Sequence, residues 1–128
     1  MPDPGEARLD AGKRIRETYL GPGGEQAFAP IAELSPTMRT WVVGELFGNA
    51  YASEVLDLRV RSLCTITSLL TLHRVEPLRN HIRGALANGV TRAELVALFE
   101  QLLWYVGLPT AAAGFTVLSE VLAEGNDG

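Results

Sequence analysis

The stretch T-R-A-E-L-V-A-L-F-E-Q-L-L-W-Y-V, residues 91–106, carries the clearest structural signal in this chain. Its apolar side chains recur at intervals of three and four residues: Leu95, Leu98, Phe99, Leu102, Leu103 and Val106. This spacing places them on one face of an α-helix. Thr91 and Glu94 stand three residues apart at its start, where a hydroxyl and a carboxylate form a capping box with the first amides. The stretch therefore predicts a helix with one buried face.

Helical signals continue on both sides of this stretch. Asp57 and Ser35 are suitable N-cap residues, and Asn88-Gly89 is a left-handed C-terminal stop. The predicted helices span residues 5–19, 36–47, 58–72, 77–88, 91–106 and 110–122. Because no alternating strand pattern is present, we predict an all-α fold, a compact subunit of about six helices.

The chain has 128 residues, which is the usual length of a single domain. We expect residues 1–128 to form one domain. Within it, residues 1–34 would supply an N-terminal helix and a linker of glycine and proline at 21–24, and residues 35–123 would form the helical core.

The predicted helix at 58–72 is apolar on nearly every side, and Cys64 lies in its middle. A helix that is apolar all round is normally buried, so we expect Cys64 to be a small core residue rather than a nucleophile. Hydrophobic residues make up 47% of the chain, more than a small core hides. We therefore expect a homo-oligomer, with this helix at a subunit interface.

Composition excludes several classes of protein. The net charge of −4 argues against a nucleic-acid partner, which requires a basic surface. A single cysteine allows no intramolecular disulfide, so the cytoplasm is the natural compartment. No apolar run approaches the roughly 20 residues that span a bilayer, and the N-terminus lacks the regions of a signal peptide. We expect no membrane association.

Most motifs of catalytic chemistry are missing from the sequence. Gly21-Pro22-Gly23-Gly24 follows no buried strand and lacks a P-loop lysine, and two histidines with one cysteine are too few for a structural zinc site. We therefore expect no metal and no cofactor. His81 lies on the apolar face of its predicted helix, where an imidazole needs a polar partner or a cavity. It is either a satisfied core histidine or a functional residue.

Five segments then follow one another in a recognisable order: Arg61-Ser62-Leu63, Leu78-x-x-His81, Ala85-Leu86-x-Asn88-Gly89-Val90-Thr91, Glu94-Leu95 and Tyr105-x-Gly107-x-Pro109. In residue types and spacing they resemble the carboxymuconolactone decarboxylase family, from about Trp41 to Leu122. The resemblance implies a helical subunit that forms trimers or hexamers. It also implies a cofactor-independent enzyme that decarboxylates a carboxylated unsaturated lactone in aromatic-ring catabolism.

Other positions separate this chain from parts of the family. A branch that resembles alkyl hydroperoxidase D uses a Cys-x-x-Cys pair, which would fall at Arg74 and Pro77, so thiol peroxidase chemistry is excluded here. Pro77-Leu78 stands where the family often has Glu-Leu, and the bulky Trp104 stands where smaller residues are usual. These changes would reshape the pocket rather than the fold.

The resemblance suggests roles for individual residues. His81 would transfer the proton, and Arg59 or Arg61 would hold a carboxylate or face a developing oxyanion. Glu45 would orient His81 or pair with an arginine. The alternative for Glu45, Arg59 and Arg61 is a structural ion pair at a helix start. The residues that we expect to wall the substrate pocket are aromatic: Trp41, Trp104 and Tyr105.

We take a carbon–carbon lyase acting on a small-molecule substrate as the leading hypothesis. Two alternatives remain open. The same residues would suit a cofactor-free cyclase or isomerase of natural-product biosynthesis, which uses enolate chemistry without loss of CO2. The second alternative is a non-catalytic helical oligomer that binds a hydrophobic small molecule, because one fold supports many functions.

Overall fold

The computed structural model describes residues 3–21 and 26–125, and this part of the chain is helical without strands. In chain order the helices are α1 (Pro4–Leu20), α2 (Ala29–Leu34), α3 (Pro36–Arg39), η1 (Thr40–Ala50), α4 (Leu58–Thr71), α5 (Val75–Ala87), α6 (Arg92–Val106) and α7 (Leu108–Glu124). The predicted all-α fold is confirmed. Most of the predicted linker, at 22–24, lies outside the described residues.

The caps expected from the sequence are present at three helix starts. Ser35 accepts a hydrogen bond from the amide of Met38, and Asp57 accepts one from the amide of Val60. Thr91 and Glu94 form the complete capping box of α6. Because these bonds join near neighbours in the chain, the sequence alone predicts them well.

Two features were not expected. The short helix α2 was not predicted, and the predicted helix at 36–47 is α-helical only over its first turn before it continues as the π-helix η1. In a π-helix each amide donates to the carbonyl five residues earlier, as the amide of Tyr51 does to Leu46 at 2.8 Å. The apolar residues of η1 still recur at intervals of three and four residues in the sequence, so this spacing does not reveal the π-helical winding.

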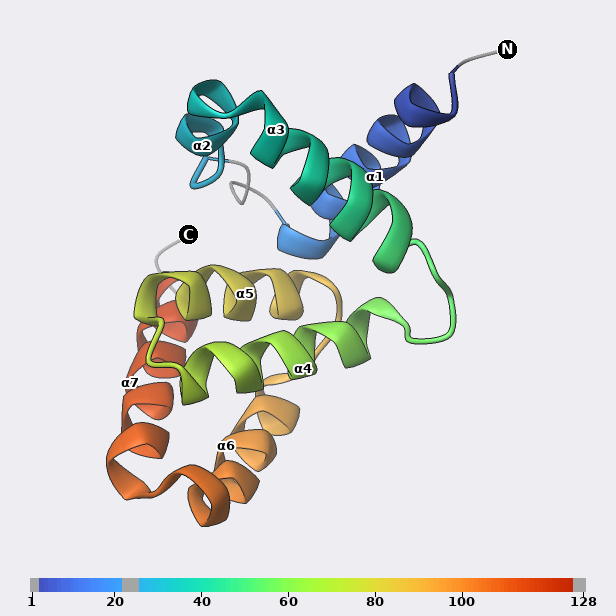
Figure 1. The fold of residues 1–128 in the computed structure, drawn as a ribbon. Coiled ribbons are helices and arrows are strands. Elements are labelled where there is room, and N and C mark those ends of the chain that lie inside the picture. Colours follow the sequence, from blue (N-terminus) through green and yellow to red (C-terminus); the bar gives the residue numbers. More distant parts are fainter. Residues whose placement is uncertain (1–2, 22–25, 126–128) are drawn as a thin grey trace.

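The helices form two parts, which Figure 1 shows one above the other. Helices α4 to α7 enclose the larger core, and its most buried members are Ile66, Leu78, Ile82, Leu95 and Phe99. Above it, α1 crosses η1, and a smaller cluster joins Tyr19 and Leu20 to Phe47. Because α1 also contacts α5, it connects the two parts.

Helix α1 approaches its neighbours at backbone distance through three glycines. A Cβ atom on Gly12 would lie 1.7 Å from the carbonyl oxygen of Val43 in η1, and one on Gly48 would lie 2.2 Å from that of Arg8. A Cβ atom on Gly84 of α5 would lie 2.4 Å from the carbonyl oxygen of Tyr19. Real Cβ atoms do not approach oxygens this closely, so a side chain at any of these positions would displace α1.

Asn88 completes the contact between α1 and α5. Its amide nitrogen donates to the carbonyl oxygens of Thr18 and Tyr19 at 2.7 and 3.1 Å, and to that of Gly84 at 2.8 Å. The last carbonyls of a helix have no partner within the helix itself. The side chain that ends α5 thereby also satisfies the end of α1.

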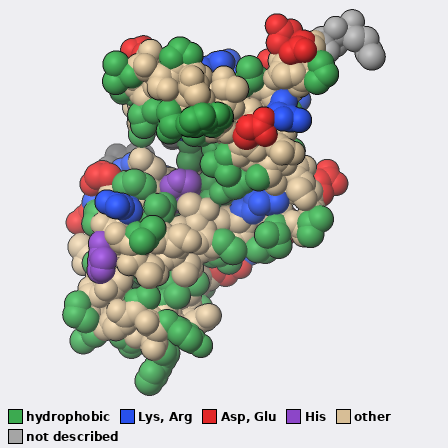
Figure 2. Space-filling view, viewed as in Figure 1, with side chains coloured by type: hydrophobic (Ala, Val, Ile, Leu, Met, Phe, Trp, Pro, Cys, Tyr) green, Lys and Arg blue, Asp and Glu red, His purple; other side chains and the backbone are tan. Residues whose placement is uncertain are grey.

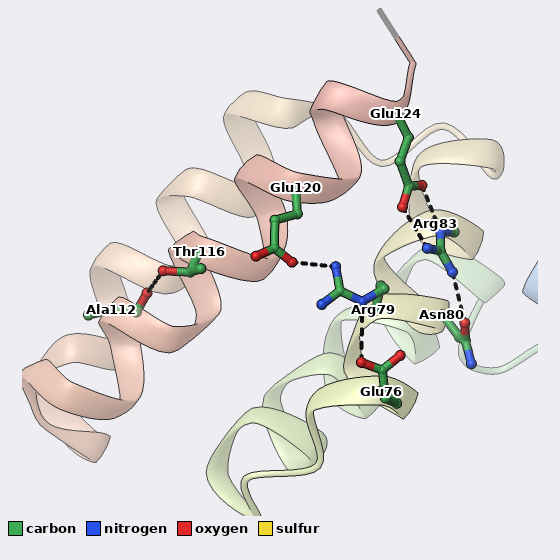
Figure 3. A network of polar contacts seen from close by, with 8 residues as sticks. All are labelled: Glu76, Arg79, Asn80, Arg83, Ala112, Thr116, Glu120 and Glu124. Atoms are coloured by element: carbon green, nitrogen blue, oxygen red, sulfur yellow. Dashed lines mark hydrogen bonds and ion pairs between the residues drawn. The ribbon is translucent and has the colours of Figure 1, made fainter. Parts of the chain in front are cut away.

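Ion pairs hold α5 against α7, as Figure 3 shows. Arg79 pairs with Glu120 at 2.6 Å, and Arg83 pairs with Glu124 at 2.6 Å. Ion pairs with an exposed carboxylate contribute little stability each. Arg79 and Arg83 face α7, and His81, two residues from each, contacts α1 instead through the ring of Tyr19.

The expectation that the helix at 58–72 is buried all round, with Cys64 in the core, is wrong for the single subunit. Only Ser62, Ile66 and Leu70 of α4 are buried, and Cys64 is exposed. The physical reason is that α5, α6 and α7 all cover the same face of α4. Within the described residues, no helix is long and apolar enough to cross a membrane. The cytoplasmic location stays a prediction.

We expect Gly12→Ala to destabilise the fold, because the new methyl group would overlap the backbone of η1. Overpacking of this kind costs about 1–3 kcal/mol, occasionally more. Gly44→Ala in the same π-helix is the matched control, since its Cβ atom would meet only the Leu9 side chain, at 3.4 Å or more. Urea unfolding of both variants measures the difference. Equal stabilities would contradict the close contact between α1 and η1.

Candidate functional site

Two cavities lie between the two parts of the molecule, and they share Arg16, Leu20 and His81. We call the first the Phe28 cavity; its volume is about 240 Å³, and its further lining residues are Ala27, Phe28, Ile31, Pro77 and Asn80. We call the second the Thr65 cavity; its volume is about 260 Å³, and its further lining residues are Val42, Leu46, Phe47, Tyr51 and Thr65. Figure 2 shows the surface hollowed between the upper and lower parts.

Arg16 brings a buried positive charge to this site. The residue is only 5% exposed, and its guanidinium carbon lies 4.5 Å from the centre of the Phe28 ring and 5.8 Å from that of Phe47. Cations are attracted to the faces of aromatic rings at such distances. Sequence reasoning missed Arg16 because α1 carries several charged residues. The available signal was its spacing from Gly12, Tyr19 and Leu20, which puts it on their face of the helix.

His81 faces Arg16 from α5 and is partly buried. Its ring centre lies 5.4 Å from that of Tyr19, at an interplanar angle of 64°. Burial, and in second place the charge of Arg16, lower the pKa of His81 from 6.5 to about 4. The imidazole is therefore neutral at pH 7 and can accept a proton or donate a hydrogen bond. The structure places it in a cavity beside a cation, which favours a functional role over a packed core histidine.

A cluster of hydroxyl groups lies beside His81. The Tyr51 and Thr65 hydroxyls are 3.1 Å apart, and the Tyr51 hydroxyl donates to that of Tyr19 at 3.4 Å. Tyr19 in turn donates to the carbonyl oxygen of Arg61 at 3.4 Å. Burial raises the pKa of Tyr19 far above its ordinary value, so this phenol stays protonated. The cluster supplies neutral hydrogen-bond groups to the wall of the Thr65 cavity.

The π-helical winding of η1 decides which of its side chains reach this cavity. Val42 and Tyr51 both line it although they are nine residues apart. In an α-helix of about 3.6 residues per turn, nine residues make about two and a half turns, which would point the two side chains in opposite directions. The larger turn of the π-helix brings both to the same side.

Glu45 points elsewhere for the same reason. It is exposed and forms an ion pair with Arg8 at 2.7 Å, and it lines neither cavity. Arg59 also takes a structural position: it donates to the carbonyl oxygen of Gly89 and pairs with Glu94 of the α6 capping box. The structure therefore does not bring Glu45 or Arg59 together with His81. Both form structural ion pairs instead, which was the alternative interpretation of these residues.

Arg61 supports the site without lining it. Its Nε donates to the carbonyl oxygen of Leu56 at 3.0 Å and its Nη2 to that of Ser53 at 3.2 Å. Its guanidinium carbon lies 5.0 Å from the centre of the Tyr51 ring. Arg61 thus closes the connection between η1 and α4 and holds Tyr51 in place. The cation of the cavities is Arg16 instead.

The three aromatic residues expected in the pocket wall are exposed in the subunit. The exposed fractions are 58% for Trp41, 85% for Trp104 and 80% for Tyr105. Trp104 borders a separate hollow of about 490 Å³ with Leu108 and Phe115, at the turn between α6 and α7. In Figure 1 this turn lies at the opposite end of the molecule from α1. The single subunit does not bring these residues to His81, and a role in substrate binding stays a prediction.

Comparisons with known proteins agree with this architecture. The model of the carboxymuconolactone decarboxylase family matches residues 36–120. The chain is 29% identical over 120 residues to a 4-carboxymuconolactone decarboxylase of Acinetobacter baylyi, covering 93% of this chain and 90% of that protein. It is 30% identical over 128 residues to an uncharacterized 15.0 kDa protein of Paracoccus denitrificans, from the nqo9-nqo10 intergenic region, covering 90% of this chain and 96% of that protein.

The low pKa of His81 makes stability depend on pH. The pKa of His81 is about 4 in the folded state and 6.5 in the unfolded chain. Above pH 6.5 the ring is neutral in both states, and the histidine makes its full contribution to the stability of the fold. That contribution is lost as the pH falls from 6.5 to about 4, and it amounts to roughly 3 kcal/mol. We expect His81→Gln to remove this part of the pH dependence, and His73→Asn, at an exposed position, to retain it.

Urea unfolding between pH 4 and 7 measures this difference, and NMR titration of the imidazole carbons gives the pKa directly. A midpoint for His81 at or above 6.5 would contradict the burial and the proximity of Arg16.

Proposed function

Since this chain belongs to the carboxymuconolactone decarboxylase family, we propose that it is a cofactor-independent carbon–carbon lyase that removes CO2 from a small carboxylated lactone or related cyclic acid. The observation that carries the proposal is the placement of Arg16 and His81 on both cavities of the site. One residue holds a buried positive charge, and the other is an imidazole that is neutral at pH 7.

Arg16 would attract the substrate. Its charge lies in a site of low solvent exposure, where an entering anion interacts with it far more strongly than in water. A guanidinium also matches the geometry of a carboxylate with two parallel hydrogen bonds. The same charge would stabilise the enolate oxygen that forms when CO2 leaves.

The reaction requires an electron sink, which the conjugated carbonyl of the substrate would supply. The bond between the ring carbon and the carboxylate breaks, its electron pair moves into the conjugated system to form an enolate, and CO2 leaves. The ring system then takes a proton at carbon from His81. An anion bound between Arg16 and His81 would raise the pKa of His81, so that the imidazole takes up from water the proton that it then delivers.

The Tyr51 and Thr65 hydroxyls would complete the polar side of the site. Both line the Thr65 cavity together with Arg16 and His81. A lactone oxygen could replace the Tyr51 oxygen as the acceptor of the Thr65 proton, which adds no charge that competes with Arg16. A cyclase or isomerase that forms the same enolate would use the same groups, so release of CO2 distinguishes that alternative from decarboxylation.

We expect His81→Ala to lower the rate of decarboxylation by about 10²–10⁴-fold, the usual contribution of a general acid or base. Incubation of the wild type and the variant with 4-carboxymuconolactone, the substrate in the name of the Acinetobacter baylyi relative, gives the rate as CO2 released. His81→Gln should fold and assemble but lose the rate, and His73→Asn should keep it. A folded His81→Ala variant with full turnover would refute the assignment.

We propose that the subunit assembles with copies of itself, as a trimer or hexamer. Three large apolar side chains at the turn between α6 and α7 are mostly exposed: Trp104, Tyr105 and Leu108. Figure 2 shows hydrophobic side chains gathered at this end of the molecule. Apolar patches of more than a few hundred square ångströms normally mark an interaction surface. A second copy would cover this patch and would also explain the bulk of Trp104.

Light scattering at micromolar concentration should therefore give a mass several times the 13.8 kDa of one chain. The double substitution Trp104→Asp and Tyr105→Asp should lower this mass, because each carboxylate would lose its hydration on assembly. A wild-type mass of 13.8 kDa would contradict the proposal. An unchanged mass of the double variant would place the interface elsewhere on the subunit.

A further inference from the structure

The two cavities at His81 differ in the chemistry of their walls. Beyond the residues that they share, the Thr65 cavity adds three apolar side chains and the hydroxyls of Tyr51 and Thr65. The Phe28 cavity instead adds four apolar side chains and one amide, that of Asn80. The oxygen of this amide already accepts a hydrogen bond from Arg83 Nη1 at 3.0 Å (Figure 3). Both cavities are therefore lined mainly by apolar side chains, and the hydroxyl groups lie only in the Thr65 cavity.

Arg16 lies at the boundary between the cavities. Its guanidinium carbon is 4.5 Å from the ring centre of Phe28, which lines only the first cavity. It is 5.8 Å from the ring centre of Phe47, which lines only the second. An anion that pairs with Arg16 can therefore extend to either side of this charge.

The combined volume of the two cavities suits one small-molecule ligand. Pockets for small molecules usually measure roughly 300–1,000 Å³. Each cavity by itself, at about 240 and about 260 Å³, falls below this range. Together they fall within it, and both open on the same arginine and histidine. A ligand that filled only the hydroxyl-lined part would leave the apolar part to water.

We propose that the substrate is a carboxylated ring that bears an apolar substituent, with the ring in the Thr65 cavity and the substituent in the Phe28 cavity. The carboxylate lies at Arg16, so this inference rests on the proposed function. The apolar walls of the Phe28 cavity then select the substituent by removing its surface from water. The substrate is thus larger than an unsubstituted carboxylated lactone.

Helix α2 offers a matched pair of positions for a test. Ile31 lines the Phe28 cavity. Leu34, three residues later on the same short helix, is 88% exposed and lines neither cavity. Since no residue of α2 is buried, a substitution on it should leave the rest of the fold intact. An asparagine placed at each position in turn exchanges an apolar side chain for a neutral polar one, so no new charge enters the cavity that Arg16 lines.

Isothermal titration of the whole protein with benzoate and with 2-ethyl-, 2-propyl- and 2-butylbenzoate tests the inference. An ortho substituent lies beside the carboxylate, so it can enter the Phe28 cavity while the ring stays in the Thr65 cavity. These probes keep one carboxylated ring and lengthen only the apolar substituent. We expect the affinity of the wild type to rise roughly three- to fourfold with each added methylene. Ile31→Asn should reduce this rise and leave the affinity for benzoate almost unchanged, whereas Leu34→Asn should retain the rise.

The outcomes separate this inference from the proposed function. If benzoate binds the wild type and Arg16→Gln weakens that binding, but chain length has no effect, the two-cavity substrate is wrong and the anion site stands. A rise that survives Ile31→Asn undiminished also overturns the inference, because the substituent then lies outside the Phe28 cavity. If benzoate fails to bind, or binds Arg16→Gln as well as the wild type, the anion site fails and the inference with it.

Discussion

Helix α1 lies against η1 and α5 at backbone distance, because Gly12, Gly48 and Gly84 carry no side chain at the points of contact. This approach brings Arg16 and Tyr19 over the upper face of α5, where His81 lies. Without it the two cavities would lose one wall and their only buried cation among the described residues. The geometry of the candidate site depends on this contact more than on any single polar interaction.

The electrostatics of the site follow from the same contact. The residues of α1 bury His81, and the charge of Arg16 adds to the effect, so that the pKa of the imidazole falls to about 4. The charge that would hold an anionic substrate therefore also keeps the histidine neutral while the site is empty. Binding of an anion would relieve this repulsion, which couples substrate binding to proton uptake.

The π-helical winding of η1 explains why part of the site could not be predicted from the sequence. With α-helical spacing, Glu45 shares a face with Trp41 and Val42 and is expected beside the pocket. The wider winding turns Glu45 to the surface, where it pairs with Arg8, and brings Tyr51 to the cavity beside Val42. Sequence periodicity carries no mark of this winding, because a π-helix forms only where tertiary packing compensates for its weaker local bonding.

The sequence by itself determined most of the helices and the caps of α4 and α6, since Asp57, Thr91 and Glu94 act on amides three residues away. It also determined that the apolar face of α5 carries His81, and the order of its motifs identified the family. Only the tertiary structure decided that Arg16, rather than Arg59 or Arg61, accompanies His81. The physical reason is range: caps and periodicity act within one or two turns of chain, whereas the site joins side chains from α1, η1, α4 and α5 that meet only when the helices pack.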